Sequence, residues 1–595
     1  MLRIFICAIL CNLFLAVSIS TAEFQFLYVE NGTLYYEDGN EVVFWGVNLQ
    51  PSLSWEYNRM KRHGLHDPFD KDDYKAMIDE AYDELEIMGV NLIRIHLSPG
   101  DITDKEGNLV ENRWLDLTDY VLAEAEKRGM YTYLAFLNTL GVARGKDTFI
   151  SRSNQTKPMW MVDPVFIQKS ERFMHQLLNR KNSYLNDIKY KNSPALALVE
   201  PINEPGYFSR ETIEDFPDCF KIYEDWIVNH ERLDDENAFY NWRMITSKSY
   251  INRMVDFFKK EEVRAPMVWS MEWPRMMEWT GKDVFEAAAE SDAPIVSVCF
   301  YPGQSVAYGK KGNDLKLVGE ENYFEYISKS YNLQEWHGWL REDRFRGKAR
   351  IVYEFETYYN QRSYLYPLMA KYFRAQGIQA AAMWTYLLPV QAEYTAAAHH
   401  LNLKTTPHKA AAFMAAGAVM YEYPRYLPYK TTSSVDDFSK NLALSYVKGS
   451  SAYADSSKLI YSDGLPKEFS DRLHINTESL NHIVGCGQSP VANYEGSGLY
   501  IVNRIDDKKI ELIIMPESKF IIPHYLPNER GEKVVDLNRN KLNTFTLNLK
   551  DCSKETVVYR LEKGKLKKIN QYYKKGLHFK AKSGKYLIYN EAGGR

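Results

Sequence analysis

The sequence predicts an α/β fold: a (β/α)8 TIM barrel followed by a C-terminal all-β, sandwich-like accessory domain. Eight short apolar runs alternate with longer segments of helical spacing over about 400 residues, a length that such barrels reach with insertions. Beyond residue 430, alternating strand-like runs with Gly, Asn and Asp turns replace the helical spacing. We therefore expect the barrel over residues 23–424 and the β domain over residues 430–595.

The eight runs are apolar on both faces, which is typical of a parallel sheet covered by helices. Two intervening helical segments, Asp72–Gly89 and Leu115–Gly129, end at glycine, a common helix terminator. A hairpin turning at Asn31-Gly32 precedes the series, and the last helix is expected over Thr405–Tyr423. No glycine-rich phosphate loop follows the first run, which argues against an open dinucleotide-binding sheet. The runs are Val42–Asn48, Val90–Leu97, Met130–Leu137, Ala195–Asn203, Pro266–Glu272, Pro294–Tyr301, Arg350–Glu356 and Ile378–Leu388.

The first 22 residues have the pattern of a signal peptide. Arg3 gives a positive start, Ile4–Val17 is nearly all apolar, and Ser20–Ala22 supplies small residues at a cleavage site. The rival interpretation, an uncleaved anchor, needs about 20 apolar residues, and this run is shorter. We expect a secreted or periplasmic protein with no membrane span after cleavage.

Composition excludes some partners. The net charge of −4 is small, and the charges are mixed in sign along the chain, so we expect no nucleic-acid partner. We also expect a monomer. Four cysteines follow the leader, which is too few for a disulfide scaffold; Cys486 and Cys552 could pair, or all four could be free.

The C-terminal domain contains no tryptophan, since all 12 lie between Trp45 and Trp384. Sugar-binding modules stack sugars on exposed aromatic rings, so this domain is expected to be a packed structural accessory. Its tyrosines and phenylalanines leave a sugar-binding surface open as the alternative.

Active sites of TIM barrels lie at the carboxyl ends of the strands, so polar and aromatic residues there are candidates. Two acids at different strand ends, with an arginine, a tyrosine and tryptophans between them, suit glycoside cleavage, which needs one protonated and one ionised carboxyl. The strand-end residues are Trp45, Asn48, Arg94, His96, Asn203, Glu204, Tyr301, Glu354, Glu356 and Trp384.

The run "VEPINEP", followed 150 residues later by "RIVYEF", resembles the clan A glycoside hydrolases, especially the cellulase- and mannanase-like family 5. The opening "GNEVVFWGVN" and the last-strand "AMWTY" fit the same pattern, and the resemblance covers Phe24 to Pro424. Two positions depart from it: Cys299 stands where many relatives have histidine, and the third strand is followed by Asn138 instead of a histidine. These departures affect substrate contacts and the exact subfamily.

The resemblance implies a role for each matching position. Glu204 would be the general acid/base and Glu354 the nucleophile, with Arg94 and Tyr301 keeping Glu354 ionised. Asn203 would hold the sugar 2-hydroxyl. Trp384 would form the sugar platform. Apart from the resemblance, His96, Asn138, Trp45 and Glu356 are further candidates for substrate contact because of their places at the strand ends. Clan A enzymes retain anomeric configuration, which places the two carboxyls about 5 to 5.5 Å apart.

Several of these residues have structural alternatives. Glu200 points to the same face as Glu204 but one layer deeper, so we expect a framework carboxylate paired with Arg94 or with a backbone amide. Glu356 shares the strand parity of Glu354 and competes with it as the nucleophile. Trp45 could be core, and His96 a framework histidine. Because His399 and His400 are adjacent and no spaced partner is evident, we expect no metal and no cofactor.

The sequence thus predicts a retaining endo-acting enzyme on a β-linked polysaccharide such as mannan or glucan. An exo-acting enzyme on oligosaccharide ends is the first alternative, because the inserts 141–193 and 205–247 are large enough to open or close a cleft. A catalytically silent carbohydrate-binding barrel is the second, although such a binder has no need of both Glu204 and Glu354. A purely structural surface protein is the third.

Overall fold

The computed structural model describes residues 23–51, 54–62, 71–138, 149–150, 157, 160–271, 277, 281–307, 309–311, 313–395, 399–525 and 532–590. The expected signal peptide, residues 1–22, lies outside the described residues. So do residues 141–148, 151–156 and 158–159 of the insert 141–193.

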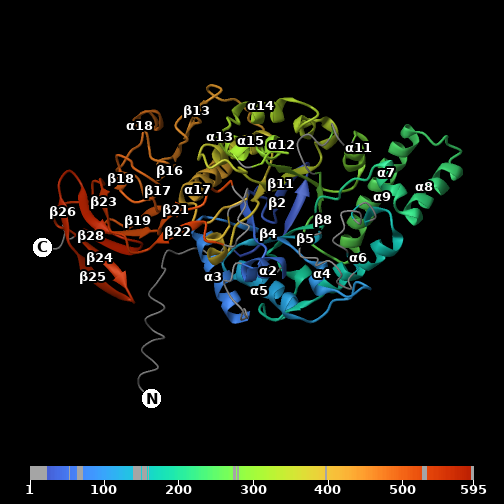
Figure 1. Cartoon of the computed structure of the whole chain (residues 1–595), viewed down its shortest axis with the longest axis horizontal. Coiled ribbons are helices and arrows are strands. Elements are labelled where there is room, and N and C mark those ends of the chain that lie inside the picture. Colours follow the sequence, from blue (N-terminus) through green and yellow to red (C-terminus); the bar gives the residue numbers. More distant parts are fainter. Residues whose placement is uncertain are drawn as a thin grey trace, which may run out of the picture.

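Eight parallel strands form the centre of the molecule (Figure 1). Each lies within one of the eight predicted runs or begins one residue before it, so the barrel prediction is confirmed. Seven ladders join the strands, and a parallel bridge between Val199 and Met267 brings the first and last strands of the sheet together. The strands are β3 Phe44–Asn48, β4 Leu92–His96, β5 Tyr131–Leu137, β8 Leu196–Ile202, β9 Val268–Ser270, β10 Ile295–Phe300, β11 Ala349–Phe355 and β12 Ala380–Met383.

Helices cover the outside of the barrel, as the alternating pattern predicts. The Asn112 side chain begins α5 by accepting from the backbone N–H groups of Trp114 and Leu115, and the left-handed Gly129 follows its end. None of the helices in the described ranges has the length and apolar character needed to cross a membrane. The helices are α2 Ser54–Arg62, α3 Lys71–Ile87, α4 Pro99–Ile102, α5 Arg113–Lys127, α6 Pro164–Leu178, α7 Arg210–Glu214, α8 Pro217–Asn229, α9 Glu236–Lys260, α11 Asp283–Glu290, α12 Gln304–Ala307, α13 Asn313–Glu320, α14 Phe324–Asn332, α15 Leu365–Ala375, α16 Pro389–Ala392 and α17 Pro407–Glu422.

The predicted N-terminal hairpin closes one end of the barrel. Strands β1 (Leu27–Glu30) and β2 (Thr33–Tyr36) pair antiparallel, and their apolar side chains join those of the first strand residues in one buried cluster. The Gln379 side chain accepts from the backbone N–H of Leu34 at 2.8 Å and donates to its carbonyl. Apolar packing therefore fills the amino ends of the strands, and the polar residues gather at the carboxyl ends.

The C-terminal region is a two-layer β structure, which confirms the sandwich-like prediction. A ten-stranded sheet has the order β13-β14-β15-β16-β17-β19-β20-β28-β24-β25, and a four-stranded sheet the order β18-β23-β27-β26. One short helix, α18 (Lys467–Leu473), is an addition that the sequence did not indicate. The strands are β13 Asp436–Ser439, β14 Leu442–Ser445, β15 Ser451–Ala454, β16 Lys458–Ser462, β17 His482–Gly485, β18 Ala492–Tyr494, β19 Tyr500–Asp506, β20 Lys509–Ile514, β21 Glu517–Phe520, β22 Val535–Asn538, β23 Asn543–Leu547, β24 Thr556–Glu562, β25 Lys565–Ile569, β26 Gln571–Tyr573, β27 Leu577–Ala581 and β28 Gly584–Asn590.

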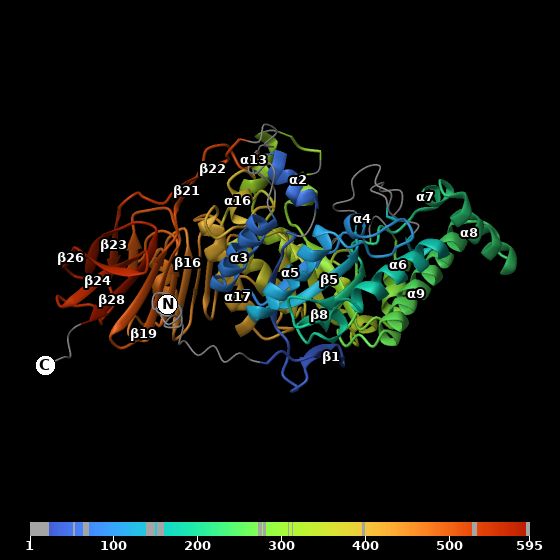
Figure 2. The ribbon, with the colours of Figure 1, turned by 90° about the horizontal axis from the view of Figure 1, so that it is seen from below.

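The larger sheet packs against the barrel through α17 (Figure 2). Along β14, Leu442 and Leu444 belong to the barrel's apolar cluster, whereas Ala443 between them belongs to the cluster inside the sandwich. This alternation follows the two-residue period of a strand and explains why β14 is buried on both faces. The Ser462 hydroxyl adds a 2.6 Å hydrogen bond to the carbonyl of His408 on α17.

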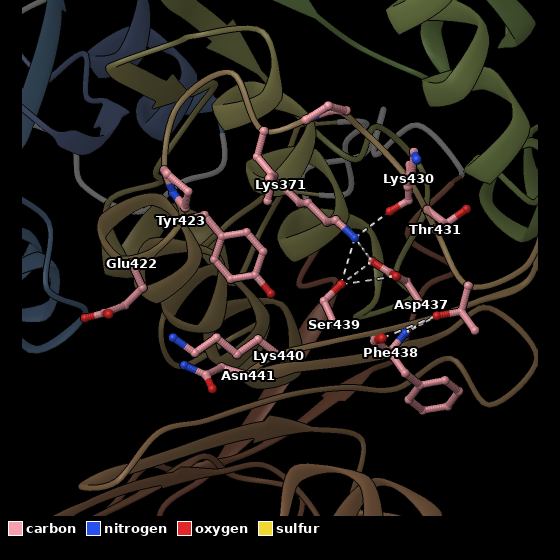
Figure 3. A pocket seen from close by; sticks show the side chains of 14 residues that line it. Lys371, Glu422, Tyr423, Lys430, Thr431, Asp437, Phe438, Ser439, Lys440 and Asn441 are labelled. Carbon is pink, nitrogen blue, oxygen red and sulfur yellow. Dashed lines mark hydrogen bonds and ion pairs between the residues drawn. The ribbon is translucent and has the colours of Figure 1, made fainter.

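A hollow of about 540 Å³ lies at this junction. Figure 3 shows the Lys371 amine at its base, directed toward three oxygens. The amine donates to the Lys430 carbonyl and the Asp437 carboxylate at 2.6 Å and to the Ser439 hydroxyl at 2.7 Å. Because an ammonium group has three donors, Lys371 is fully used in linking α15 to β13.

The four cysteines of the described residues are buried and free. Cys486 and Cys552 therefore form no disulfide with each other, and the alternative of free thiols is the one observed. Burial raises the pKa of both thiols, that of Cys552 to about 12. Both behave as small apolar core residues.

Candidate functional site

Arg94 is the centre of the polar network at the carboxyl ends of the strands. Its side chain is fully buried on β4. One terminal nitrogen donates to Glu354 at 2.8 Å and to Asn48 at 2.9 Å. The other donates to both oxygens of Glu200, at 2.9 and 3.0 Å, and to the Asn203 amide oxygen at 2.8 Å. One cation thus connects side chains from β3, β4, β8 and β11.

Glu200 is the framework carboxylate that the sequence predicts. It is fully buried, and besides Arg94 it accepts from the Tyr133 hydroxyl. The Arg94 guanidinium also lies over the rings of Tyr133 and Tyr353, 5.1 and 4.9 Å from their centroids. A buried charge needs such partners, and the two rings add cation–π contacts to the hydrogen bonds with Glu200.

Glu354 lies near the end of β11 and has three polar neighbours. Arg94 reaches one carboxylate oxygen, and the Tyr301 hydroxyl donates to the other at 2.7 Å. His96 Nε2 is 3.2 Å from the first oxygen. Tyr301 follows β10, the neighbouring strand, so adjacent strand ends supply both the carboxylate and the hydroxyl that orients it.

A bulge in β11 brings Tyr353 and Glu354 to the same network although they are consecutive. The pairing register with β10 shifts between Val298 and Cys299, so that Cys299 lies opposite Glu354. The Asn48 amide donates to the Tyr353 carbonyl at 3.1 Å, within the segment where the ladder with β12 is interrupted. Bulges of this kind redirect side chains next to active sites.

Glu204 follows β8 by two residues and is half-buried. The Tyr353 hydroxyl donates to its carboxylate at 3.2 Å, and the Lys157 amine donates to its carbonyl at 2.7 Å. Its φ of 47° lies in the left-handed region, which residues other than glycine rarely adopt. Strain of this kind persists only where surrounding contacts maintain it.

Glu204 and Glu354 differ in the groups that oppose the rise in pKa caused by burial. Burial raises the pKa of the Glu204 carboxyl, and the negative charge of Glu354 raises it further. Burial also raises the pKa of Glu354, but there the Arg94 charge and the Tyr301 hydrogen bond oppose the rise. Lys157, the Tyr353 hydrogen bond and Arg94 oppose the rise at Glu204 as well. The contrast lies in the direct contacts of Arg94 and Tyr301 with Glu354, which give the ionised form of Glu354 the stronger support.

His96 is a neutral neighbour of this pair. Its Nε2 is 2.7 Å from an Arg94 terminal nitrogen, and burial, followed by the Arg94 charge, holds the pKa of the imidazole well below its usual range. Nε2 thus faces a donor, Arg94, and an acceptor, the Glu354 carboxylate, and the tautomer of the neutral ring decides with which of the two it forms a hydrogen bond. The ring centroid is 5.0 Å from that of Trp384. His96 therefore joins the carboxylate network to the aromatic side chain above it.

Trp384 and Asn138 differ in accessibility. Trp384 follows β12 and is half-buried, so part of its ring is open to a ligand. Asn138 follows β5 and is fully buried, with its amide nitrogen donating to the Leu97 carbonyl. The role of Trp384 as a sugar platform stays a prediction, whereas that Asn138 contact holds the ends of β4 and β5 together.

Two predicted substrate contacts are corrected by the structure. Trp45 is fully buried in the layer between the barrel and α17, and its indole nitrogen donates to the Phe413 carbonyl at 3.0 Å. Glu356 is also fully buried and pairs with Lys409 at 2.9 Å. β11 ends at Phe355, so strand parity no longer applies at Glu356, and the two glutamates do not share a face.

Three residues of the site were not predicted from the sequence: Tyr133 and Tyr353 of the network, and Lys157 beside Glu204. Tyr133 lies two residues beyond Tyr131 on β5, so strand parity could have identified it. Tyr353 could not have been identified in this way, because consecutive residues of a regular strand point to opposite faces and Glu354 is the next residue. The bulge in β11 brings both side chains to the same network.

No group of three or more His, Cys, Asp and Glu side chains in the described ranges is placed to hold a metal ion. Of the adjacent histidines, His400 contacts the Thr405 hydroxyl at 2.9 Å, and His399 lies against the ring of Tyr301, 5.2 Å between centroids. The two side chains thus have different neighbours, and the expectation of a metal-free site stays a prediction.

The chain matches no known protein-family model. Over 207 residues it is 26% identical to mannan endo-1,4-beta-mannosidase 2 of Arabidopsis thaliana, a match that covers 31% of this chain and 43% of the relative. Over 118 residues it is 29% identical to mannan endo-1,4-beta-mannosidase 5 of the same plant, covering 18% of this chain and 27% of the relative. The chain is similar to endo-β-mannosidases.

Solved structures that resemble the fold include an endo-1,4-beta-mannanase from Rhizomucor miehei, with a TM-score of 0.44, 13% identity, and coverage of 67% of this chain and 100% of that one. An endo-beta-1,4-mannanase from Thermotoga petrophila has a TM-score of 0.44 at 12% identity, covering 92% of this chain and 98% of that one.

The relatives confirm the resemblance to the clan A, family 5-like glycoside hydrolases that the sequence motifs indicated. The chain spans less than half the length of the two endo-β-mannosidases that it matches. The activity and substrate of the whole protein are therefore matters for proposal.

Proposed function

We propose that this chain is a retaining glycoside hydrolase that cleaves β-1,4-linked mannan within the polymer. The observation that carries the proposal is the link through β11. Tyr353 holds Glu204 at 3.2 Å, and the next residue, Glu354, is held by Arg94 and Tyr301. In this proposal Glu204 is the protonated and Glu354 the ionised carboxyl of the pair that retaining glycosidases require.

In the proposed first step, Glu204 gives its proton to the glycosidic oxygen while the Glu354 carboxylate attacks the anomeric carbon. The bond to the leaving sugar breaks, and an ester between that carbon and Glu354 forms. Arg94 and Tyr301 keep Glu354 ionised and oriented before the attack. The neutral His96 contributes no charge that would compete with Arg94 for the carboxylate.

In the proposed second step, Glu204 removes a proton from a water molecule. The oxygen of that water attacks the anomeric carbon from the face opposite the ester bond to Glu354. The ester breaks, Glu354 returns as a carboxylate, and the product keeps its original configuration. Asn203, fixed by Arg94 at 2.8 Å, is positioned to bind the sugar 2-hydroxyl. The half-buried Trp384 would stack against the sugar ring.

The named activities of the relatives support mannan as the substrate, since both are mannan endo-1,4-beta-mannosidases. We propose further that residues 1–22 direct export, so that the enzyme meets its polysaccharide outside the cytoplasm. The barrel of 23–424 would then act as the catalytic domain of a monomer, with residues 430–595 as its accessory domain.

An azide experiment on three variants tests the two carboxyl roles. The substrate is an aryl β-mannobioside, whose leaving group departs without an acid. In Glu354→Ala, azide attacks the anomeric carbon directly and should give the α-mannosyl azide. In Glu204→Ala, azide attacks the ester on Glu354 and should give the β-mannosyl azide. Glu356→Ala, matched in chemistry but outside the network, should give neither.

The same protein incubated with galactomannan and with β-glucan separates the remaining alternatives. A rapid fall in viscosity with mixed manno-oligosaccharides supports endo-action, whereas mannose or mannobiose released from the start supports an exo-acting enzyme. Binding of glycan without any cleavage would leave the silent-binder interpretation, and an α-azide from Glu356→Ala would transfer the nucleophile's role to Glu356.

A further inference from the structure

The charges of this chain are not evenly mixed, contrary to the expectation from the whole sequence. Residues 563–585, "KGKLKKINQYYKKGLHFKAKSGK", contain nine lysines and no aspartate, glutamate or arginine. A run of this length with one sign of charge is unusual in a protein of net charge −4. It produces a local positive potential that the net charge conceals.

The fold places this run at the open edges of both sheets of the C-terminal region. Strand β25 is the last strand of the ten-stranded sheet, and β26 is the last of the four-stranded sheet. Both lie at one end of the molecule's long axis, with α7 and α8 at the other (Figures 1 and 2). We call the exposed lysines of this end the lysine edge: Lys563, Lys565, Lys567, Lys568, Lys574, Lys575 and Lys580.

Little of this charge is neutralised within the protein. Among the described residues, Lys567 has one distant partner, Glu562, at 3.9 Å, and Lys580 donates to the neutral Thr544 hydroxyl at 2.9 Å. Lysines on an edge strand also prevent sheet-to-sheet aggregation, but one inward-facing charge or a few lysines suffice for that. Seven exposed lysines therefore call for an external anion.

Exposed aromatic rings accompany the lysines. Tyr572 is 60% exposed and Tyr573 38% exposed on the short strand β26. The Tyr572 ring lies flat against His578, with centroids 4.8 Å apart and an interplanar angle of 6°. An exposed ring held in a fixed plane is a surface on which a sugar can stack, which answers the open alternative for this domain.

We propose that the lysine edge, with Tyr572, binds an anionic polysaccharide whose carboxylate or sulfate groups pair with the lysines. The choice of a glycan as the anion rests on the proposed function, because an enzyme retained on an acidic glycan matrix reaches the neutral mannan within it. Lysines supply point charges that suit regularly spaced acid groups. The absence of arginine from the run disfavours bidentate recognition of phosphate in a nucleic acid.

A second copy of the chain is the other candidate source of negative charge. The segment 210–236, which contains α7 and α8, carries ten acidic residues and three basic ones. Because it lies at the opposite end of the molecule (Figure 1), its pairing with the lysine edge would be head-to-tail and would build a ring or an open filament. A monomer is expected from the sequence, so the glycan is the occupant we choose.

The test uses the full-length chain with Glu354→Ala, which is expected to bind glycans without cleaving mannan, and immobilised polygalacturonate as the probe. We expect retention that weakens steeply between about 50 and 200 mM salt. The triple variant Lys565→Gln, Lys568→Gln, Lys574→Gln should bind about tenfold less tightly or worse. Tyr572→Ser should also weaken binding, at unchanged charge.

The matched control removes the same charge elsewhere, by Lys259→Gln, Lys310→Gln and Lys311→Gln on exposed positions of the barrel. Equal weakening in this control would overturn the proposal, as would tighter binding of duplex DNA or of phosphatidylserine vesicles than of polygalacturonate. Sedimentation showing concentration-dependent assembly that the lysine-edge variant abolishes would also overturn it, in favour of a second copy.

A hydrolysis assay distinguishes failure of the lysine-edge proposal from failure of the proposed glycosidase function. With Glu354 restored, the lysine-edge variant should cleave soluble manno-oligosaccharides within twofold of wild type, since the edge is distant from the barrel site. Retention on polygalacturonate without any mannan cleavage would support the lysine edge and contradict the proposed function. Mannan cleavage without retention on polygalacturonate would support the proposed function and contradict the lysine edge.

Discussion

Arg94 and Glu354 are 260 positions apart in the chain and form a 2.8 Å ion pair in the barrel interior. The same guanidinium holds Glu200, so one positive charge serves two buried carboxylates. Burial of a charge is unfavourable unless partners surround it, and here each member depends on the others. We therefore expect a change at Glu200 to affect stability, and a change at the contacts of Glu354 to affect the pH dependence of activity.

Replacing Glu200 with Ala should destabilise the protein by about 3 to 5 kcal/mol, because it leaves the buried Arg94 with one carboxylate in place of two. Urea unfolding followed by tryptophan fluorescence measures the change. Glu214→Ala, which removes an exposed partner of Arg210, is the control and should change stability by less than about 1 kcal/mol. A loss at Glu200 as small as that of the control would mean that Arg94 is held adequately by Glu354 alone.

Replacing Tyr301 with Phe removes the 2.7 Å hydrogen bond to Glu354. That bond opposes the rise of the Glu354 pKa on burial, so its loss raises the pKa further. The ionised nucleophile is then populated only at higher pH. We expect kcat/KM to fall about tenfold to a hundredfold at neutral pH, with the acidic limb of its pH profile displaced upward.

Tyr366→Phe is the matched control for that pH profile. The Tyr366 hydroxyl donates to Glu356 at 2.9 Å, so the variant loses the same type of bond at a carboxylate outside the network. Its acidic limb should coincide with that of wild type. A displaced limb in Tyr366→Phe, or an unmoved one in Tyr301→Phe, would show that Tyr301 does not set the ionisation of Glu354.

The pattern of the sequence predicts much of this site because strand ends and strand parity depend on local residue order. Arg94, Asn203, Tyr301 and Glu354 meet for that reason, each at the carboxyl end of its strand. The failures occur where parity is interrupted. The bulge turns Tyr353 inward, and such register shifts depend on pairing with neighbouring strands that one sequence does not reveal.

Glu356, expected from the sequence among the substrate contacts, forms a buried ion pair with Lys409. Lys409→Met should destabilise the protein by about 3 to 5 kcal/mol, since it leaves the Glu356 carboxylate uncompensated. Adding Glu356→Gln should recover most of that loss. A double-mutant cycle in urea measures the coupling, and additive losses would contradict a direct pair. Activity per folded molecule should stay near wild type in the double variant.

His337 should contribute to acid sensitivity. Burial lowers the pKa of its imidazole from the ordinary value to about 3 in the folded chain, where it contacts the Tyr372 hydroxyl at 2.8 Å. Below about pH 6.5 the unfolded chain therefore binds a proton that the folded chain does not. The stability that this group contributes above that pH is lost as the pH falls toward about 3, at about 1.4 kcal/mol per pH unit.

The variant His337→Gln checks this sign. Between pH 7 and about pH 4.5 its free energy of unfolding should fall by about 2 to 3 kcal/mol less than that of wild type. The comparison is between slopes, so a uniform loss of packing does not affect it. The same substitution at the exposed His230 should leave the wild-type slope unchanged. Parallel curves for His337→Gln and wild type would contradict the assignment.

Trp384 and Trp45 provide the sharpest contrast between a ligand-facing and a core tryptophan. The half-buried Trp384 ring lies 5.0 Å from His96 beside the carboxylates, so Trp384→Ala should reduce kcat/KM on manno-oligosaccharides about tenfold to a hundredfold with little change in Tm. Trp45 is fully buried against Phe355 and Phe413, and Trp45→Ala should cost about 3 to 5 kcal/mol of stability instead.

Steady-state kinetics and thermal unfolding of both variants decide between these roles. Trp45→Phe keeps most of the packing and should therefore retain the wild-type KM. If Trp384→Ala lowers Tm by as much as Trp45→Ala while leaving KM unchanged, the Trp384 ring belongs to the core, and the sugar platform has to come from another residue at the barrel mouth. His399, whose ring lies 5.2 Å from that of Tyr301, would be the next position to replace.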